Sequence, residues 1–253
     1  MSPSDIASYR ARVIQRHREA FNIHTTTAVA IERALLIPRR HRTAVHYAID
    51  MFMLQSCKTH SAVSLLAQHG LMEDTATGAR RLLELSVQAV YVGAARPRPE
   101  RQRRAGRYLA HMWREVPTRI KRALPASVRE YWSGIARQYG RLIRRGAQSW
   151  GPGWKAMFSE IDQLPLYELD YSLLSGIAHG RSTEQIINFS RTAIQLQSDQ
   201  FVSVLLVYST KYYLVVAEQW NKLYRRISRD SFDALVSAAT TWRPTRTTPL
   251  GAA

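Results

Sequence analysis

The sequence contains very few of the residues that build disulfide frameworks or metal centres. Cys57 is its only cysteine, which excludes an internal disulfide and any cysteine-rich zinc site. The eight histidines lack the spacing with acidic partners that metal ligands need, so the sequence predicts no metal and no cofactor. Cys57 lies among apolar residues, and we interpret it as a small core residue rather than a nucleophile.

Several motifs and targeting signals are also absent. The chain has no metalloprotease H-E-x-x-H motif, no phosphate-binding P-loop and no dinucleotide-binding G-x-G-x-x-G motif. Its N-terminal segment lacks the apolar core of a signal peptide. The most apolar stretch, residues 201–217, contains Lys211 and is short for a membrane span. We therefore expect a cytoplasmic protein without a membrane span.

Strand-like alternation does not persist anywhere, whereas segments with helical periodicity are long and separated by proline and glycine. We expect an all-α protein that forms a single multi-helix bundle over residues 1–240, followed by a flexible tail at 241–253. Apolar residues make up 45% of the chain, enough for a substantial core. The expected helices span residues 4–22, 41–69, 72–93, 99–115, 126–146, 166–179, 183–194, 199–227 and 229–240.

Positive charge is abundant and is concentrated in one segment. Lys and Arg number 36 against 19 acidic residues, which gives a formal net charge of +17. Residues 96–145 hold 15 of the basic residues and only 3 acidic ones. We interpret residues 96–146 as a basic helical segment inserted into the bundle. A field of this sign favours nucleic acid or another polyanion as a partner, with an anionic membrane surface second.

Residues 126–146 are predicted to form a strongly amphipathic helix within this basic segment. One face carries an apolar seam, which we interpret as core: Val128, Trp132, Ile135, Tyr139 and Leu142. The opposite face carries arginines that either contact phosphate or are merely solvated: Arg129, Arg137, Arg141 and Arg144. Some aromatic side chains could stack on bases, although large aromatics in helices are more often core: Tyr108, Trp113, Trp150 and Trp154.

The segment YSLLSGIAHG contains a ladder of polar residues at a spacing of four. Tyr171, Ser175 and His179 fall on one face of the expected helix, at the edge of its apolar stripe. Gly180 is a residue that commonly ends a helix, which places His179 at a helix C-terminus. The helix dipole there favours the protonated imidazole.

A second ladder lies on the helix expected at residues 72–93. Arg80, Glu84 and Gln88 are also spaced four apart at the edge of an apolar stripe. Because partly buried polar groups need partners, we expect this helix to pack against the helix at 166–179, so that the two ladders meet. The resulting network is either a reactive site or a polar contact that fixes the register of the two helices.

These segments resemble a bacterial helical family of unknown function. That family is marked by an R-x-x-x-E helix, matched within residues 58–93, and by a Y-x-x-L-S-x-x-x-H helix, matched within residues 171–180. The family in turn resembles the HEPN helical proteins, many of which are metal-independent endoribonucleases of toxin–antitoxin and phage-defence systems. The positions that the resemblance marks as the site are Arg80, Glu84, Tyr171, Ser175 and His179.

The resemblance implies an HEPN-like core and an RNA-directed function, with RNA favoured over DNA. It also implies a homodimer and a partner protein such as an antitoxin or defence component. In the implied endoribonuclease, His179 is the general base or acid that acts on the ribose 2′-hydroxyl or the leaving oxygen. Arg80 or Arg181 stabilises the charge on the phosphate. The remaining marked residues bind or orient these groups: Glu84, Tyr171 and Ser175.

The match departs from the ribonuclease signature at one point. That signature places an arginine shortly before the histidine, whereas residues 172–175 read Ser, Leu, Leu, Ser. Arg181 or Arg80 could replace it only if the fold brings either one close to His179. The alternative function is therefore a non-catalytic helical module that binds nucleic acid or protein. A third alternative, a membrane-surface helix, requires the apolar seam of residues 126–146 to be exposed.

Overall fold

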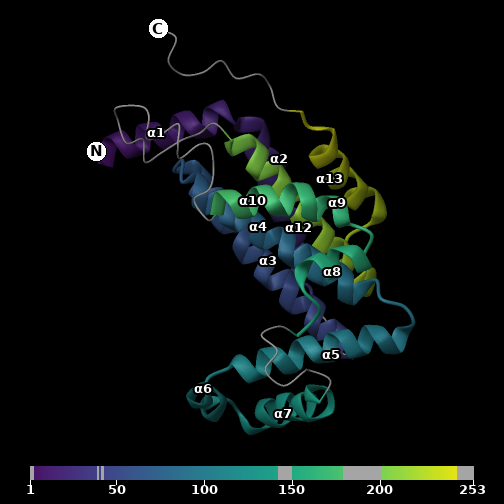
Figure 1. Cartoon of the computed structure of the whole chain (residues 1–253). Helices are drawn as coiled ribbons and strands as arrows, with labels where there is room; N and C mark the ends of the chain where they lie inside the picture. Colours follow the sequence, from purple (N-terminus) through teal and green to yellow (C-terminus); the bar gives the residue numbers. More distant parts are fainter. Residues whose placement is uncertain (1–2, 39, 41–42, 142–149, 179–200, 244–253) are drawn as a thin grey trace.

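The computed structural model describes residues 3–38, 40, 43–141, 150–178 and 201–243. Every regular element in these ranges is a helix and none is a strand, which confirms the all-α prediction. Three long helices form the centre and pack against one another: α3 (Ala44–Gln68), α4 (Met72–Gly93) and α12 (Val202–Tyr224) (Figure 1). The predicted tail lies largely outside the described residues, as does the helix expected at 183–194.

Helix α12 is rich in valine and tyrosine, residues that usually favour strands. It is nevertheless helical, because α2 (Arg18–Leu35), α3 and α4 cover it on several sides and bury apolar residues all around it. Asp50 on α3 is also buried, and its carboxylate accepts hydrogen bonds from Trp220 Nε1 at 2.7 Å and Tyr224 Oη at 3.1 Å. Helix α12 is therefore fixed to α3 by packing and by a buried polar contact.

The N-terminal part of the chain differs from the sequence prediction. The expected helix at 4–22 is two helices, α1 (Pro3–Arg16) and α2, and α2 continues to Leu35. Thr25, Thr26 and Thr27 have low helix propensity, and for this reason the sequence did not predict that the helix continues to Leu35. Its buried side, including Phe21 and Ile31, packs on the core and outweighs that preference.

Helices α5 (Arg98–Glu115), α6 (Thr118–Ala123) and α7 (Ala126–Gly140) project from one end of the bundle (Figure 1). We call them the arginine-rich extension. Helix α7 folds back on α5, where the rings of Trp113 and Trp132 stack with centroids 6.2 Å apart. Arg114 donates a hydrogen bond to the carbonyl oxygen of Gly140 at 2.9 Å. These contacts hold α7 in a fixed orientation on α5.

The α5–α7 contact also depends on the absence of a side chain at Gly106. A Cβ atom there would lie 2.3 Å from Cγ of Tyr139. We expect Gly106→Ala to lower the free energy of unfolding by about 1–3 kcal/mol, because the Tyr139 ring must move. Gly134→Ala is the matched control, since its Cβ would meet nothing within 4 Å and alanine favours a helix. Thermal unfolding that shows Gly106→Ala to be as stable as Gly134→Ala would contradict this packing.

After the extension, the chain returns along α4 as four short elements. These are α8 (Trp154–Glu160), α9 (Leu164–Leu166), the π-helical turn η1 (Tyr167–Tyr171) and α10 (Ser172–Ala178). The sequence predicted one continuous α-helix at 166–179, and the π turn is therefore a departure from it. Helix α10 packs against α4, which confirms the predicted pairing of the two ladder-bearing helices.

Candidate functional site

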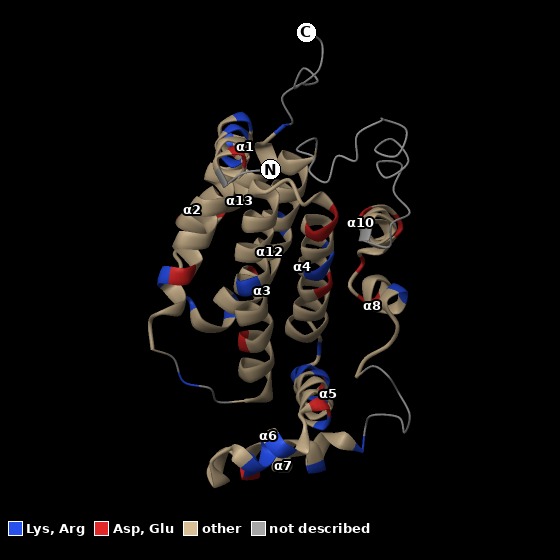
Figure 2. Cartoon of the chain, turned by 90° about the vertical axis from the view of Figure 1, so that its left-hand side faces the viewer, with Lys and Arg blue, Asp and Glu red and all other residues tan. Residues whose placement is uncertain are grey.

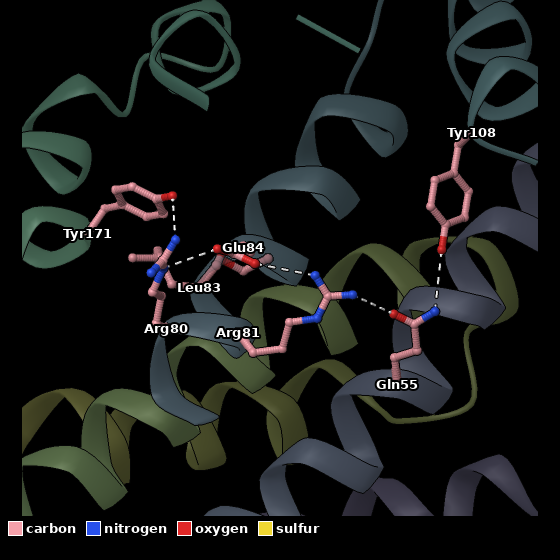
Figure 3. A network of polar contacts seen from close by, with 8 residues as sticks. Gln55, Arg80, Arg81, Leu83, Glu84, Tyr108 and Tyr171 are labelled. Carbon is pink, nitrogen blue, oxygen red and sulfur yellow. Dashed lines mark hydrogen bonds and ion pairs between the residues drawn. The ribbon is translucent and has the colours of Figure 1, made fainter. Parts of the chain in front are cut away.

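The two predicted ladders meet through Arg80. Its guanidinium donates a hydrogen bond to Tyr171 Oη at 2.9 Å and a charged hydrogen bond to Glu84 Oε1 at 3.2 Å (Figure 3). The side chains of Arg80 and Glu84 are 20% and 13% exposed. At this burial a charge-assisted hydrogen bond contributes more than a surface ion pair does. The structure therefore brings together Arg80, Glu84 and Tyr171 as the sequence predicted.

The π turn places Tyr171 on α4. Consecutive side chains of a helical turn point in different directions, so adjacent residues of η1 can contact two different helices. Asp170 accepts a hydrogen bond from Tyr212 of α12 at 2.8 Å, and Tyr171 accepts one from Arg80 of α4. On α10, Leu174 is buried on the protein, whereas the neighbouring Leu173 is 65% exposed.

The polar network extends further than the sequence indicated. Arg81 donates to the second carboxylate oxygen, Glu84 Oε2, at 3.3 Å and to Gln55 Oε1 at 3.0 Å (Figure 3). The Gln55 amide in turn donates to Tyr108 Oη at 3.4 Å, and burial raises the pKa of Tyr108 to about 12. Arg80 and Arg81 thus share the carboxylate of Glu84. The Arg81–Glu84 spacing of three was visible in the sequence, but the contact with Gln55 depends on the α3–α4 packing.

Of the other predicted site residues, the structure describes only some. Ser175 is half-buried on α10, as expected, and is not part of the hydrogen-bonded network of Arg80. His179 directly follows Ala178, the last residue of α10, and lies outside the described residues, as do Arg181 and Arg144. The described part of the site is therefore an arginine held by a carboxylate and a phenol at the side of α10.

The orientation of α7 agrees with the predicted amphipathic pattern. Ile135 is buried, and Trp132 and Tyr139 are half-buried against the core. Val128 departs from the predicted seam because it is 37% exposed, and Leu142 lies outside the described residues. A membrane-surface helix requires this seam to be exposed. Trp132 and Tyr139 instead pack on the protein itself, so α7 does not meet that requirement.

Exposed arginines gather on the arginine-rich extension and on the loop that leads into it (Figure 2). Some basic residues of this region are occupied by the protein, as Arg104 is by Glu100 and Glu160. Seven others are exposed and have neither an ion pair nor a side-chain hydrogen bond among the described residues. They are Arg96, Arg98, Arg119, Arg122, Arg129, Arg137 and Arg141. Three of them were predicted as one face of α7, and the structure adds four from α5, α6 and the preceding loop.

The aromatic residues proposed for base stacking are mostly core residues. Tyr108, Trp113 and Trp150 are buried, and Trp154 is half-buried. Tyr131, which no pattern in the sequence marks, is 40% exposed on α7. Its exposure could not be read from the sequence, because it depends on where the seam of α7 meets α5.

No helix of the described residues is long and apolar enough to cross a membrane. No three His, Cys, Asp or Glu side chains in these ranges lie together as potential ligands of a metal ion.

The fold and the site define an all-helical protein with a basic extension and a separate arginine–carboxylate–tyrosine network. No protein-family model, no curated protein and no solved structure matches this chain.

Proposed function

We propose that this protein binds nucleic acid, and RNA in particular, through the arginine-rich extension. The observation that carries the proposal is the set of seven exposed arginines without an ion pair or a side-chain hydrogen bond among the described residues. The charge of an arginine that is ion-paired within the protein is offset by its partner. These seven have no such partner among the described residues, and each can contact a phosphate. RNA is favoured over DNA because of the sequence resemblance to RNA-directed helical proteins.

The distribution of charge distinguishes this surface from an ordinary solvated one. Residues 96–141 carry thirteen Lys and Arg residues but only three acidic ones, Glu100, Glu115 and Glu130. Surfaces that serve only solubility usually mix both signs of charge. A concentration of one sign attracts a polyanion over a distance and speeds its association.

A salt titration tests this proposal. Filter binding of RNA should show a logarithm of affinity that falls linearly with the logarithm of salt concentration, by roughly 0.7 for each phosphate contacted on a single strand. With several of the seven arginines engaged, we expect a slope of about −3 to −5. RNA and DNA of the same sequence should be compared in parallel. Absence of binding at low salt, or an affinity that salt does not change, would contradict the proposal.

Metal-independent cleavage of RNA is a second candidate function, favoured by the contact between Arg80 and Tyr171. This contact holds a guanidinium beside α10, and His179 is the next residue in the chain after that helix. In this function His179 transfers a proton at the ribose 2′-hydroxyl, while Arg80 stabilises the charge on the phosphate. Glu84 and Tyr171 keep the guanidinium in place.

A cleavage assay in EDTA tests the second candidate. We expect wild-type protein to cut RNA and leave 2′,3′-cyclic phosphate ends, and His179→Ala to abolish cutting with little change in the melting temperature. Arg80→Lys retains the charge but loses the planar guanidinium, and should reduce the rate. Equal cleavage by wild type and His179→Ala, or no cleavage by wild type, would leave a binding protein whose ladders are structural.

A further inference from the structure

Tyr131 is an exposed aromatic side chain on α7, in the arginine-rich extension. It is 40% exposed, although the other aromatic residues of α7, Trp132 and Tyr139, pack against the core. In the sequence it lies between Arg129 and Arg137, which are also exposed but point to other sides of the helix. An exposed ring on the same helix as these arginines is a feature that phosphate binding alone does not require.

The ring of Tyr131 is held in place by its neighbours. Its centroid lies 4.9 Å from that of Tyr47 on α3 and 5.9 Å from that of Trp132, in an edge-to-face arrangement with the latter. Val128, one turn earlier on α7, is also exposed and extends the apolar surface beside the ring. A ring that is already fixed loses little conformational entropy when a ligand stacks on it.

We propose that the ligand of the arginine-rich extension is single-stranded nucleic acid, with one unpaired base stacked on Tyr131. This inference rests on the nucleic-acid binding proposed above and specifies the form of the ligand. In a duplex the faces of the bases are covered by their neighbours, so an exposed tyrosine gains little from it. In a single strand each base has an accessible face, and aromatic side chains beside a basic surface are the usual means of binding it.

An anionic membrane is the competing partner, because arginine, tyrosine and valine also occur at membrane surfaces. Two features favour nucleic acid. The main apolar seam of α7 is used for packing on the protein and is not available to lipid. Among the described residues of the extension, the exposed large apolar side chains are Ile120, Val128 and Tyr131, which are enough for one or two bases but too few for a bilayer.

The test compares a short single-stranded RNA with the same strand annealed to its complement, using fluorescence anisotropy at low salt. Tyr131→Ala should weaken binding of the single strand roughly tenfold and leave duplex binding unchanged. Tyr131→Phe keeps the ring and should bind like wild type. Tyr208→Ala removes a similarly exposed tyrosine from α12 and serves as the matched control.

Each outcome has a distinct meaning. If Tyr131→Ala binds the single strand as tightly as wild type does, or weakens both ligands equally, the stacking proposal is wrong. If replacement of Arg129, Arg137 and Arg141 by glutamate still weakens RNA binding in that case, nucleic-acid binding by the extension stands without the stacking proposal. If wild type binds neither RNA but binds vesicles that contain anionic lipid, and Tyr131→Ala weakens that binding, the partner is a membrane and both proposals are wrong.

Discussion

Replacing Arg129, Arg137 and Arg141 by glutamate is expected to weaken RNA binding by about a hundredfold or more at low salt. The substitution removes three cations from α7 and adds three anions, so any phosphate at this face is repelled instead of attracted. The three side chains are exposed, and none has an acidic partner in the described part of the chain. The fold should therefore tolerate the change, and circular dichroism should show wild-type helicity.

A control variant with the same change of net charge shows whether RNA contacts the α7 face itself or responds only to the overall charge of the protein. Arg12, Arg18 and Arg33 are exposed on α1 and α2, away from the extension. Their replacement by glutamate should reduce affinity only modestly, through the weaker long-range attraction. If filter binding shows the two triple variants to be equally impaired, then the α7 face is merely solvated and net charge alone drives the association.

The parts of the fold that the sequence predicted well are those with strong periodicity. The bounds of α4 agree with the predicted helix at 72–93, and α7 presents its arginines to solvent as its apolar seam required. The contact between Arg80 and Tyr171 was predicted because two partly buried polar edges need each other. These predictions needed only the helical periodicity of each segment and the rule that partly buried polar groups require partners.

The features that the sequence did not predict arise from tertiary contacts. The π turn of η1 exists where Asp170 and Tyr171 contact different helices, and no local pattern shows that these two partners lie side by side. Tyr131 looks like an ordinary helix residue until the packing of α7 on α5 leaves it exposed. Similarly, no sequence pattern pairs His24 of α2 with His60 of α3, although their rings are stacked in the core.

Acid is expected to destabilise the protein through this buried histidine pair. The rings of His24 and His60 lie parallel, with centroids 3.5 Å apart, and His60 also stacks on Tyr213 of α12 at 4.2 Å. Both histidines are almost completely buried. The nearby polar groups are neutral and would stabilise a charged imidazole only weakly. Thr210 Oγ1 lies 3.3 Å from His60 Nε2, and Cys57 is hydrogen-bonded to Tyr213.

The neutral form of both rings is therefore favoured in the folded protein. Burial lowers the pKa of His24 to about 4, and burial together with the neighbouring His24 lowers the pKa of His60 well below its usual value. In the unfolded chain both titrate near 6.5. Their contribution to stability is complete above about pH 6.5 and decreases as the pH falls toward 4, because only the unfolded state takes up the protons.

The expected loss from His24 alone is on the order of 3 kcal/mol between about pH 6.5 and pH 4. Urea unfolding across this range, followed by circular dichroism, measures it. His24→Leu removes one titrating ring at similar volume and should flatten the dependence of stability on pH, whatever its effect at neutral pH. His111→Leu makes the same change at a half-buried position on α5 and should leave that dependence as in wild type. If His24→Leu loses as much stability in acid as wild type does, the stacked pair does not cause the acid sensitivity.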